Sequence, residues 1–359
     1  MTHQRMLRVL VADDSRVSLE LMVHIIDSAQ DMQVVGTAVT GREIVTMAGE
    51  LHPDIILMDM ILPELNGLQA IQEIMCLYPV PIVAISAQIE EAENDLAIQA
   101  IRAGALTAIP KPHSPRSPRF AADKDLLVST LRMMAGVHVI HHSLPVKRPI
   151  GAAKTAGPIA KRPAWQALPE IVVIVASTGG PAALSEVING LPANFPLPIV
   201  IVQHMAADFL QSLLLHLAVS SPLAVSMAHE DELPLPGHIY LAPGLAHLRL
   251  SHGHRFSLDP IQGGAQFMPS GTILLESIAT AYRNRAVGII LTGMGSDGTA
   301  GLSRMYAAGA FTIAQDEATS IVFGMPKSAI EANAVSQVLP LPEIAPALLS
   351  LCTRGKNHA

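Results

Sequence analysis

The chain has 359 residues, of which half are hydrophobic and only 15% are charged, with a net charge of −7. At about 100–200 residues per domain this length predicts two or three domains, and the hydrophobic content excludes a disordered chain. The longest apolar stretches, such as Ile171–Ala176, are far shorter than the roughly 20 residues of a membrane span. No signal peptide or membrane insertion is predicted, and Cys76 and Cys352 are too few for a disulfide framework. We therefore expect a cytoplasmic protein.

Over the first 120 residues, hydrophobic stretches alternate with segments of helical periodicity. The predicted strands are Arg8–Ala12, Gln33–Val39, Ile55–Met58, Ile82–Ile85 and Leu106–Ile109. The predicted helices are Arg16–Ala29, Arg42–Leu51, Gly67–Leu77 and Asp95–Ala103. This alternation predicts an α/β fold with a five-stranded, parallel, doubly wound sheet. In such sheets, functional groups collect beyond the carboxyl ends of the strands.

A basic segment separates two acidic blocks. Residues 1–120 carry 8 basic and 15 acidic side chains, residues 121–169 carry 7 and 2, and residues 170–359 carry 8 and 13. The basic segment holds one predicted helix, Asp125–Ala135, and is otherwise rich in Pro, Ala, Gly and Lys, which is typical of a linker. We therefore expect a first domain at 1–122, a linker at 123–168 and a second domain at 169–355. Neither domain has the basic excess of a nucleic-acid-binding domain.

The strand-helix pattern restarts after the linker. The predicted strands are Ile171–Ala176, Pro198–Gln203, Ile239–Ala242, Val287–Leu291 and Phe311–Ala314. The predicted helices are Pro181–Asn189, Asp208–Leu217, Ile273–Tyr282 and Thr299–Ala308. This pattern predicts a second α/β domain with a mostly parallel sheet. Within it, Ile239–Ala242 and the following His-, Ser- and Gly-rich stretch are predicted to be antiparallel.

Polar side chains end the predicted strands of the first block. Asp13, Asp14 and Asp59 follow strands that are neighbours in the common five-stranded order, and Ser86 and Lys111 end two more strands on the same edge. Three clustered carboxylates repel one another unless a cation such as Mg²⁺ lies between them. Any one of these residues alone is most often a strand-end cap. Together they predict a magnesium site with Asp59 as a phosphoryl acceptor.

Residues 5–120 resemble the receiver domain of two-component response regulators. The matching residues are Asp13-Asp14, Asp59, Pro63, Asn66-Gly67, Ser86-Ala87 and Lys111-Pro112. The resemblance implies that a histidine kinase phosphorylates Asp59. It also implies that Mg²⁺ binds to Asp13, Asp14 and Asp59, and that Ser86 and Lys111 are the switch residues.

A serine, a histidine and an aspartate stand out in the second block. Ser177 lies on a tight turn between a predicted strand and a helix, His204 ends the next strand, and Asp297 lies in a glycine-rich loop. A serine needs a base to become a nucleophile, and the base needs an orienting acid. Spacing alone leaves Asp208 and Asp316 as other candidates for the acid. The Ser-Thr-Gly-Gly turn could equally bind a phosphate.

Residues 170–352 resemble the catalytic domain of chemotaxis-type protein-glutamate methylesterases, the CheB family. The matching segments are Ala176–Gly180, Gln203–Met205, Leu241–Gly244, Leu291–Gly298, Thr312–Glu317, Gly324–Pro326 and Val338–Leu341. Together with the receiver domain, the resemblance covers nearly the whole chain, and the order of the two domains is itself characteristic.

The resemblance implies a role for each matching residue. Ser177 would be the nucleophile, His204 the general base and acid, and Asp297 the orienting acid, with Thr178 and Met294 as supporting residues. The substrates would be glutamate methyl esters on methyl-accepting chemoreceptors, with glutamine deamidation as a second activity and no cofactor for the esterase. The unphosphorylated receiver domain would cover the active site.

Four departures from the family patterns accompany the resemblance. Leu62 replaces a frequent methionine, and Ala108 occupies the aromatic switch position of receiver domains, where the usual coupling to Ser86 needs a ring. Val175 stands where the esterase family has glycine. The family's Arg-Pro-Ser-Val-Asp segment reads Met-Pro-Ser-Gly-Thr at residues 268–272, which is expected to alter substrate contacts or the domain interface.

Three other functions fit parts of the sequence. The departures at Val175 and residues 268–272 would fit a catalytically impaired esterase that serves as a phosphorylation-dependent binding module. A DNA-binding response regulator is disfavoured by the acidic second block. A nucleotide-binding domain built on Ser177–Gly180 is disfavoured because no Walker lysine follows.

Overall fold

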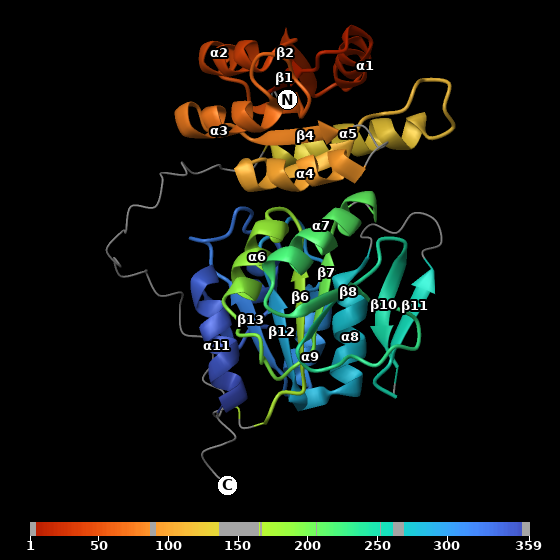
Figure 1. The fold of residues 1–359 in the computed structure, drawn as a ribbon, viewed down its shortest axis with the longest axis vertical. Helices are drawn as coiled ribbons and strands as arrows, with labels where there is room; N and C mark the ends of the chain where they lie inside the picture. The colour runs from red at the N-terminus through yellow and green to blue at the C-terminus, as the bar shows by residue number, and fades with distance from the viewer. Residues whose placement is uncertain are drawn as a thin grey trace. The chain divides into compact units, whose positions relative to one another are not determined.

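The computed structural model describes residues 5–86, 91–135, 165, 167–205, 207–251, 253–260 and 269–353 (Figure 1). They belong to two compact units, which divide between Gly151 and Ala152. Ala87, Met268 and the Pro-rich part of the predicted linker lie outside the described residues. Across the described segments, no helix has the length and hydrophobicity that crossing a bilayer requires.

The first unit contains the predicted doubly wound sheet. Its strands are β1 (Leu7–Ala12), β2 (Met32–Ala38), β3 (Ile55–Asp59), β4 (Ile82–Ser86) and β5 (Thr107–Pro110). All pair in parallel in the order β2-β1-β3-β4-β5, so the predicted fold class is confirmed. β3 and β4 are buried along their whole length because helices cover both faces of the sheet.

The helices of the first unit begin at polar caps. They are α1 (Arg16–Asp27), α2 (Gly41–Leu51), α3 (Gly67–Leu77), α4 (Glu91–Ala103) and α5 (Phe120–Met134). Ser15, Thr40 and Asn66 each accept a backbone N–H of the first turn of α1, α2 and α3, respectively. α1 packs with α5, and α3 packs with both α2 and α4.

The helix α5 packs on the sheet of the first unit. Leu127 and Leu131 are buried, α5 contacts β3 and β4, and Arg132 Nε lies 2.6 Å from Asp31 Oδ2 just before β2. The predicted linker, residues 123–168, contains most of this helix. Hydrophobic periodicity identifies the helix but does not show what it packs against. Its contacts give reason to assign it to the first domain.

The second unit is built on a seven-stranded sheet. Its strands are β6 (Ile171–Ala176), β7 (Ile199–Gln203), β8 (Ala224–Met227), β9 (His238–Leu241), β12 (Ala286–Ile290), β13 (Phe311–Gln315) and β14 (Gln337–Leu339). They pair in parallel in the order β14-β13-β12-β6-β7-β9-β8. The chain moves outward on one side from β6 to β8 and on the other from β12 to β14. The strand order therefore reverses between β6 and β12, the position where open α/β sheets form their functional crevice.

One strand direction differs from the prediction. β9 pairs in parallel with β7 and β8, so the expected antiparallel arrangement is wrong for this strand. Its residues Ile239, Tyr240 and Leu241 are all buried, which is the pattern of an inner parallel strand rather than of a half-exposed one. The following β10 (Ala246–Leu250) and β11 (Phe256–Pro260) do form the predicted antiparallel pair.

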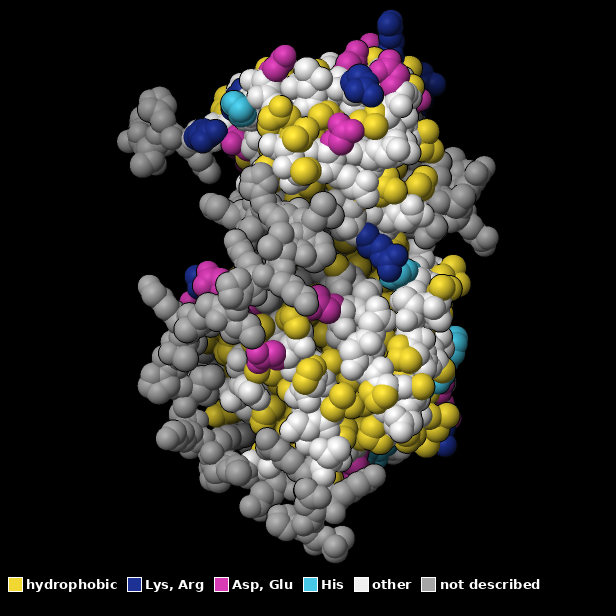
Figure 2. Space-filling view, turned by 60° about the vertical axis from the view of Figure 1, so that its left-hand side comes forward, with side chains coloured by type: hydrophobic (Ala, Val, Ile, Leu, Met, Phe, Trp, Pro, Cys, Tyr) yellow, Lys and Arg dark blue, Asp and Glu magenta, His cyan; other side chains and the backbone are white. Residues whose placement is uncertain are grey.

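Helices cover both faces of the second sheet (Figure 1). They are α6 (Gly180–Asn189), α7 (Ala207–Ser220), α8 (Gly271–Ala281), α9 (Thr299–Ala307), α10 (Met325–Glu331) and α11 (Leu341–Thr353), with a short 3-10 helix, η1 (Arg283–Arg285). α6 contacts α7 and α11, whereas α9 contacts α8 and α10. On the face that Figure 2 displays, charged side chains are sparse, as the 15% charged content predicts.

The only tryptophan of the chain is attached to the second unit. Trp165 donates its indole N–H to the backbone oxygen of Gly309 at 3.0 Å, and its ring lies 5.4 Å from that of Phe311 on β13. An indole usually finds such a partner when it is partly buried. A side chain that precedes the expected boundary at residue 169 is therefore attached to the second unit.

Candidate functional site

Three chain segments meet at the carboxyl edge of the second sheet, on both sides of the reversal in strand order. Ser177 follows β6, His204 follows β7, and residues 292–298 follow β12. Backbone hydrogen bonds join them: His204 N–H donates to Ala176 O at 3.0 Å, and Ser177 N–H donates to Thr292 O at 3.1 Å. The parallel register thus places the serine between the histidine and the glycine-rich loop.

Gln203 holds the serine and histidine segments together. Its side-chain amide donates to Ser177 O at 2.8 Å and to His204 O at 3.0 Å. Its Oε1 is buried and has no hydrogen-bond partner among the described residues, and a Cβ on Gly180 would lie only 2.0 Å from that oxygen. Position 180 therefore needs glycine so that the first residue of α6 can pass over the amide.

His204 is bound to Asp297. His204 Nε2 lies 2.8 Å from Asp297 Oδ2, and both side chains are largely buried. Asp297 also accepts hydrogen bonds from Ser270 Oγ at 3.0 Å, Gly271 N–H at 2.5 Å and Thr272 N–H at 3.0 Å. The carboxylate therefore sits at the amino-terminal end of α8, where backbone N–H groups and the helix dipole favour a negative charge.

The hydrogen bonds to Asp297 determine where the protons lie in the His204–Asp297 pair. Burial raises the pKa of Asp297, but hydrogen bonds and charge from His204, together with hydrogen bonds from Thr272, outweigh it, and the pKa lies well below its ordinary value. An ionised carboxylate only accepts hydrogen bonds, so the Nε2–H of His204 must donate to it. In the neutral imidazole, Nδ1 then carries no proton and can act as a base.

The supporting residues are held by a buried polar network. Thr292 Oγ1 donates to Thr178 O at 2.9 Å, and Thr292 N–H donates to Gln315 Oε1 at 2.7 Å. Gly293 O accepts from Met325 N–H at 2.8 Å, which fixes the loop that carries Met294. The network ties the turn after Ser177 to the loop that ends at Asp297.

The alternative acids are not brought to the histidine. Asp316 accepts the backbone N–H and the hydroxyl of Thr319, at 3.0 and 2.6 Å, and so caps a turn. The side chain of Asp208 lies outside the described residues. The geometry therefore favours Asp297. Ser177 and His204 directly follow the paired residues Ala176 and Gln203 at the ends of β6 and β7.

Sequence reasoning missed the residues that hold Asp297 and the two strand ends. Segment 268–272 was assigned to substrate or interface contacts, but its residues Ser270, Gly271 and Thr272 bind Asp297. A serine directly before a predicted helix is a typical N-cap, and that signal could have identified Ser270. Nothing in the pattern around Gln203 indicates that it binds two backbone carbonyl groups.

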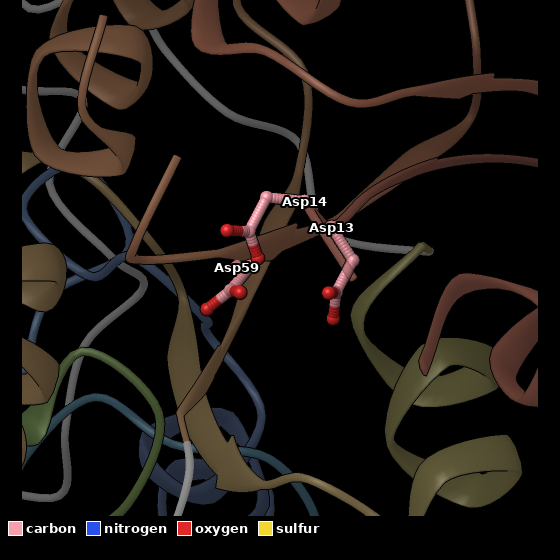
Figure 3. A group of neighbouring side chains, drawn as sticks. All are labelled: Asp13, Asp14 and Asp59. Atoms are coloured by element: carbon pink, nitrogen blue, oxygen red, sulfur yellow. The ribbon is translucent and has the colours of Figure 1, made fainter. Parts of the chain in front are cut away.

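The predicted acidic cluster is present in the first unit. One carboxylate oxygen each from Asp13, Asp14 and Asp59 lies within 4.8 Å of the others, and Figure 3 shows the three groups gathered at the strand ends. Lys111 Nζ lies 2.6 Å from Asp59 Oδ2 and 2.9 Å from Asp13 Oδ2. The ammonium group of Lys111 thus pairs with two of the three carboxylates, and the four side chains together carry a net negative charge.

The charge balance of this cluster fits a divalent cation. Burial raises the pKa of Asp59, and the hydrogen bond and charge of Lys111 offset this only partly. The donor set is entirely carboxylate oxygen, which hard cations such as Mg²⁺ prefer. A divalent cation would relieve the cost of burying these charges.

The other predicted receiver residues lie on the same edge. Ser86 ends β4 and is buried, and its backbone oxygen accepts from Lys111 N–H at 2.9 Å. Ala108 on β5 is also buried and pairs with Ala84 on β4. A buried methyl group therefore occupies the position at which receiver domains carry a movable ring.

Family models match both units. One described as CheB methylesterase matches residues 172–348, and one described as response regulator receiver domain matches residues 9–119. Solved structures from Thermotoga maritima also match. The CheB methylesterase catalytic domain is 42% identical, covering 51% of this chain and 98% of that chain at a TM-score of 0.49. The response regulator domain of CheB is 40% identical, covering 37% and 99% at a TM-score of 0.34.

Relatives match along nearly the full length. Protein-glutamate methylesterase/protein-glutamine glutaminase 4 of Myxococcus xanthus (strain DK1622) is 40% identical over 347 residues, which is 96% of each chain. The protein-glutamate methylesterase/protein-glutamine glutaminase of Thermotoga maritima is 39% identical over 350 residues, 97% of this chain and 99% of that one. The chain therefore belongs to the family of CheB-type protein-glutamate methylesterases/protein-glutamine glutaminases that carry a receiver domain.

Proposed function

We propose that this chain hydrolyses glutamate methyl esters on chemoreceptors with Ser177, His204 and Asp297 as a catalytic triad, and that phosphorylation of Asp59 activates it. The observation that carries the proposal is the buried His204–Asp297 pair, held by three further donors beside the end of the strand that carries Ser177. A histidine oriented in this way on an ionised acid is the arrangement that activates a serine.

The proposed reaction follows the protonation of the pair. Ser177 Oγ attacks the ester carbonyl carbon and gives its proton to His204 Nδ1, while Asp297 stabilises the resulting imidazolium. The N-terminal turn of α6 supports the oxyanion, with Thr178 and Met294 beside it. His204 then returns the proton to the leaving methoxide, and methanol departs. Water, deprotonated by His204, then attacks the acyl-serine. The bond to Ser177 Oγ breaks, His204 returns the proton to Oγ, and the glutamate side chain is released.

A glutamine side chain can enter the same cycle. Its amide carbonyl presents the same geometry to Ser177, and the proton that His204 returns goes to the leaving nitrogen, so that ammonia replaces methanol. Deamidation is therefore proposed as the second activity. We propose no cofactor for the hydrolytic domain, because the nucleophile, base and acid are all side chains of this chain.

The receiver domain supplies the regulation. Asp59 accepts the phosphoryl group from a histidine kinase, with Ser86 and Lys111 beside it as the switch residues. Asp13, Asp14 and Asp59 would hold Mg²⁺, which neutralises charge on the transferred group. The proposed substrates are methyl-accepting chemoreceptors, reached from the cytoplasm without membrane insertion or nucleic-acid binding.

The test measures methanol release from methylated receptor membranes in Mg²⁺, with and without a small phosphodonor. We expect release that rises with the donor, and its loss in Ser177→Ala, which removes the nucleophile. Release that persists in this variant would overturn the triad. No release from folded wild-type protein would favour the binding-module alternative, and a covalent serine probe that labels Ser177 would argue against that alternative.

A further inference from the structure

The side chain of Val175 fills the space beside Gly271. Val175 is the penultimate residue of β6, two positions before Ser177, and is completely buried. Gly271 is the first residue of α8. A Cβ on Gly271 would lie 2.3 Å from Val175 Cγ1 and 2.9 Å from Val175 Cγ2. Real side chains do not approach so closely, so valine at 175 excludes any side chain at 271.

Space, and not backbone conformation, requires this glycine. The φ of Gly271 lies outside the left-handed region, unlike that of Gly179 or Gly298. An alanine could therefore adopt the backbone angles of residue 271 without strain. Its Cβ would meet the Val175 side chain, and either β6 or the beginning of α8 would have to move.

The backbone of Gly271 is part of the arrangement around the proposed acid. Its N–H lies 2.5 Å from Asp297 Oδ2, the same oxygen that accepts from His204 Nε2 at 2.8 Å. The neighbouring Ser270 and Thr272 donate to the other oxygen. A shift of the first turn of α8 would therefore change the position of the carboxylate that orients the histidine.

We propose that Val175 and Gly271 act as a complementary pair of positioning residues, which sets the beginning of α8 on Asp297 and so orients His204. The inference rests on the proposed function. Both positions are among the departures from the family pattern that the sequence contains. Because the Val175 side chain occupies the space that a side chain at position 271 would need, these departures compensate each other and leave the donors to Asp297 in place.

The test is a double-mutant cycle in the full-length protein. Gly271→Ala adds one carbon against Val175 Cγ1 and Cγ2 and 3.2 Å from Asp297 Oδ2. Val175→Ala removes the two valine carbons, which make the closest contacts, and leaves the carboxylate contact. Methanol release from methylated receptor membranes, with saturating phosphodonor, is divided by the sites titrated with a covalent serine probe. The control is Val173→Ala, since Val173 lies on the same face of β6, is equally buried and is farther from the site.

For Gly271→Ala we expect kcat per titrated site to fall by about tenfold or more, with KM almost unchanged, because small displacements of catalytic groups are costly. In Val175→Ala/Gly271→Ala, kcat should rise several-fold above that of Gly271→Ala, and the 3.2 Å contact of the added carbon with Asp297 Oδ2 keeps it somewhat below that of Val175→Ala. Val173→Ala should lower the melting temperature without lowering kcat per site.

Two results would overturn the pair. One is a Gly271→Ala protein whose melting temperature falls while its kcat per titrated site stays that of wild type, which indicates a structural role alone. The other is a double variant no more active than Gly271→Ala. If Gly271→Ala does not fold, the double variant is compared with Val175→Ala, and a kcat that is lower by about tenfold or more in the double variant overturns the pair. Failure of the proposed function would instead appear as wild-type protein without methanol release.

Discussion

The pKa values of two buried aspartates at the carboxyl edges of parallel sheets are shifted in opposite directions in this molecule. Burial raises the pKa of both Asp59 and Asp297. For Asp297, His204 and hydrogen bonds from Thr272 outweigh burial, and the net pKa is lowered. For Asp59, the single ammonium of Lys111 is shared with Asp13, and the net pKa stays raised.

The number of hydrogen-bond donors, and not the depth of burial, therefore distinguishes the orienting acid Asp297 from the proposed phosphoryl acceptor Asp59. A carboxylate that accepts from a histidine, a serine and two backbone N–H groups is well satisfied, so it is suited to hold a base in place. A carboxylate with too few donors retains its need for a cation, and it is suited to join a metal and accept a phosphoryl group.

The largest expected effect comes from removing the carboxylate of Asp297. Asp297→Asn puts an amide in place of a group that accepts from His204, and it should lower kcat about 10⁴-fold because the imidazole loses its required tautomer. Methanol release measures this loss. The matched control is Asp316→Asn, the alternative acid, for which we expect wild-type kcat within about twofold. Equal losses in the two variants would remove the basis for choosing Asp297.

The same variant carries a pH prediction. Since the pKa of Asp297 in the folded protein lies below its ordinary value of 3.8, the charged form contributes stability that is present above pH 3.8 and is lost as the pH falls below it. Thermal unfolding between pH 3 and 7 should show this loss in wild type, and the Asn variant should be less stable at pH 7 with a flatter acid profile. A profile parallel to that of wild type would contradict the lowered pKa.

For Asp59, the same substitution should change stability in the opposite direction. Asp59→Asn removes a charge that burial disfavours, so it should raise the melting temperature of the receiver domain at pH 7 without Mg²⁺, by about 2–4 °C. Mg²⁺ should stabilise wild type more than the variant, as calorimetry can measure. In the methanol assay, the ratio of release with donor to release without it should fall to one. A variant that is still stimulated would rule out Asp59 as the acceptor.

The smallest expected effect comes from removing one of the hydrogen-bond donors to Asp297. Ser270→Ala deletes a hydrogen bond to Asp297 and the N-cap of α8, and it should cost about 1 kcal/mol of stability. We expect kcat to fall only several-fold, because His204, Gly271 and Thr272 still bind the carboxylate. Urea unfolding and methanol release test both parts. A loss as large as that of Asp297→Asn would show that the donors are not redundant.

Sequence periodicity predicted the first sheet well, because all five strands are short hydrophobic stretches bounded by helices. It did less well where a pattern has two readings. The sequence of β9 was grouped with the His-, Ser- and Gly-rich stretch that follows it and was predicted to be antiparallel. That stretch does form an antiparallel hairpin, whereas β9 is a buried inner strand that pairs in parallel. The helix α5 was found but assigned to the linker, since charge and proline content do not report packing.

In the candidate site, too, some features could be predicted from the sequence and others could not. Residues at strand ends, such as Ser177, His204 and Asp59, could be found from the sequence because the carboxyl ends of parallel strands meet at one edge. Contacts between segments far apart in the chain could not. Val175 and Gly271 are 96 positions apart, and the sequence pattern does not show that the side chain of one fills the space beside the other.

The attachment of Trp165 gives the protein an intrinsic optical reporter. As the only indole in the chain, it accounts for all tryptophan fluorescence, and its environment is a backbone carbonyl and the ring of Phe311. Its emission therefore reports whether the start of the second unit is seated against β13, without any added dye. A fragment begun at residue 169 would lose both this signal and the aromatic contact.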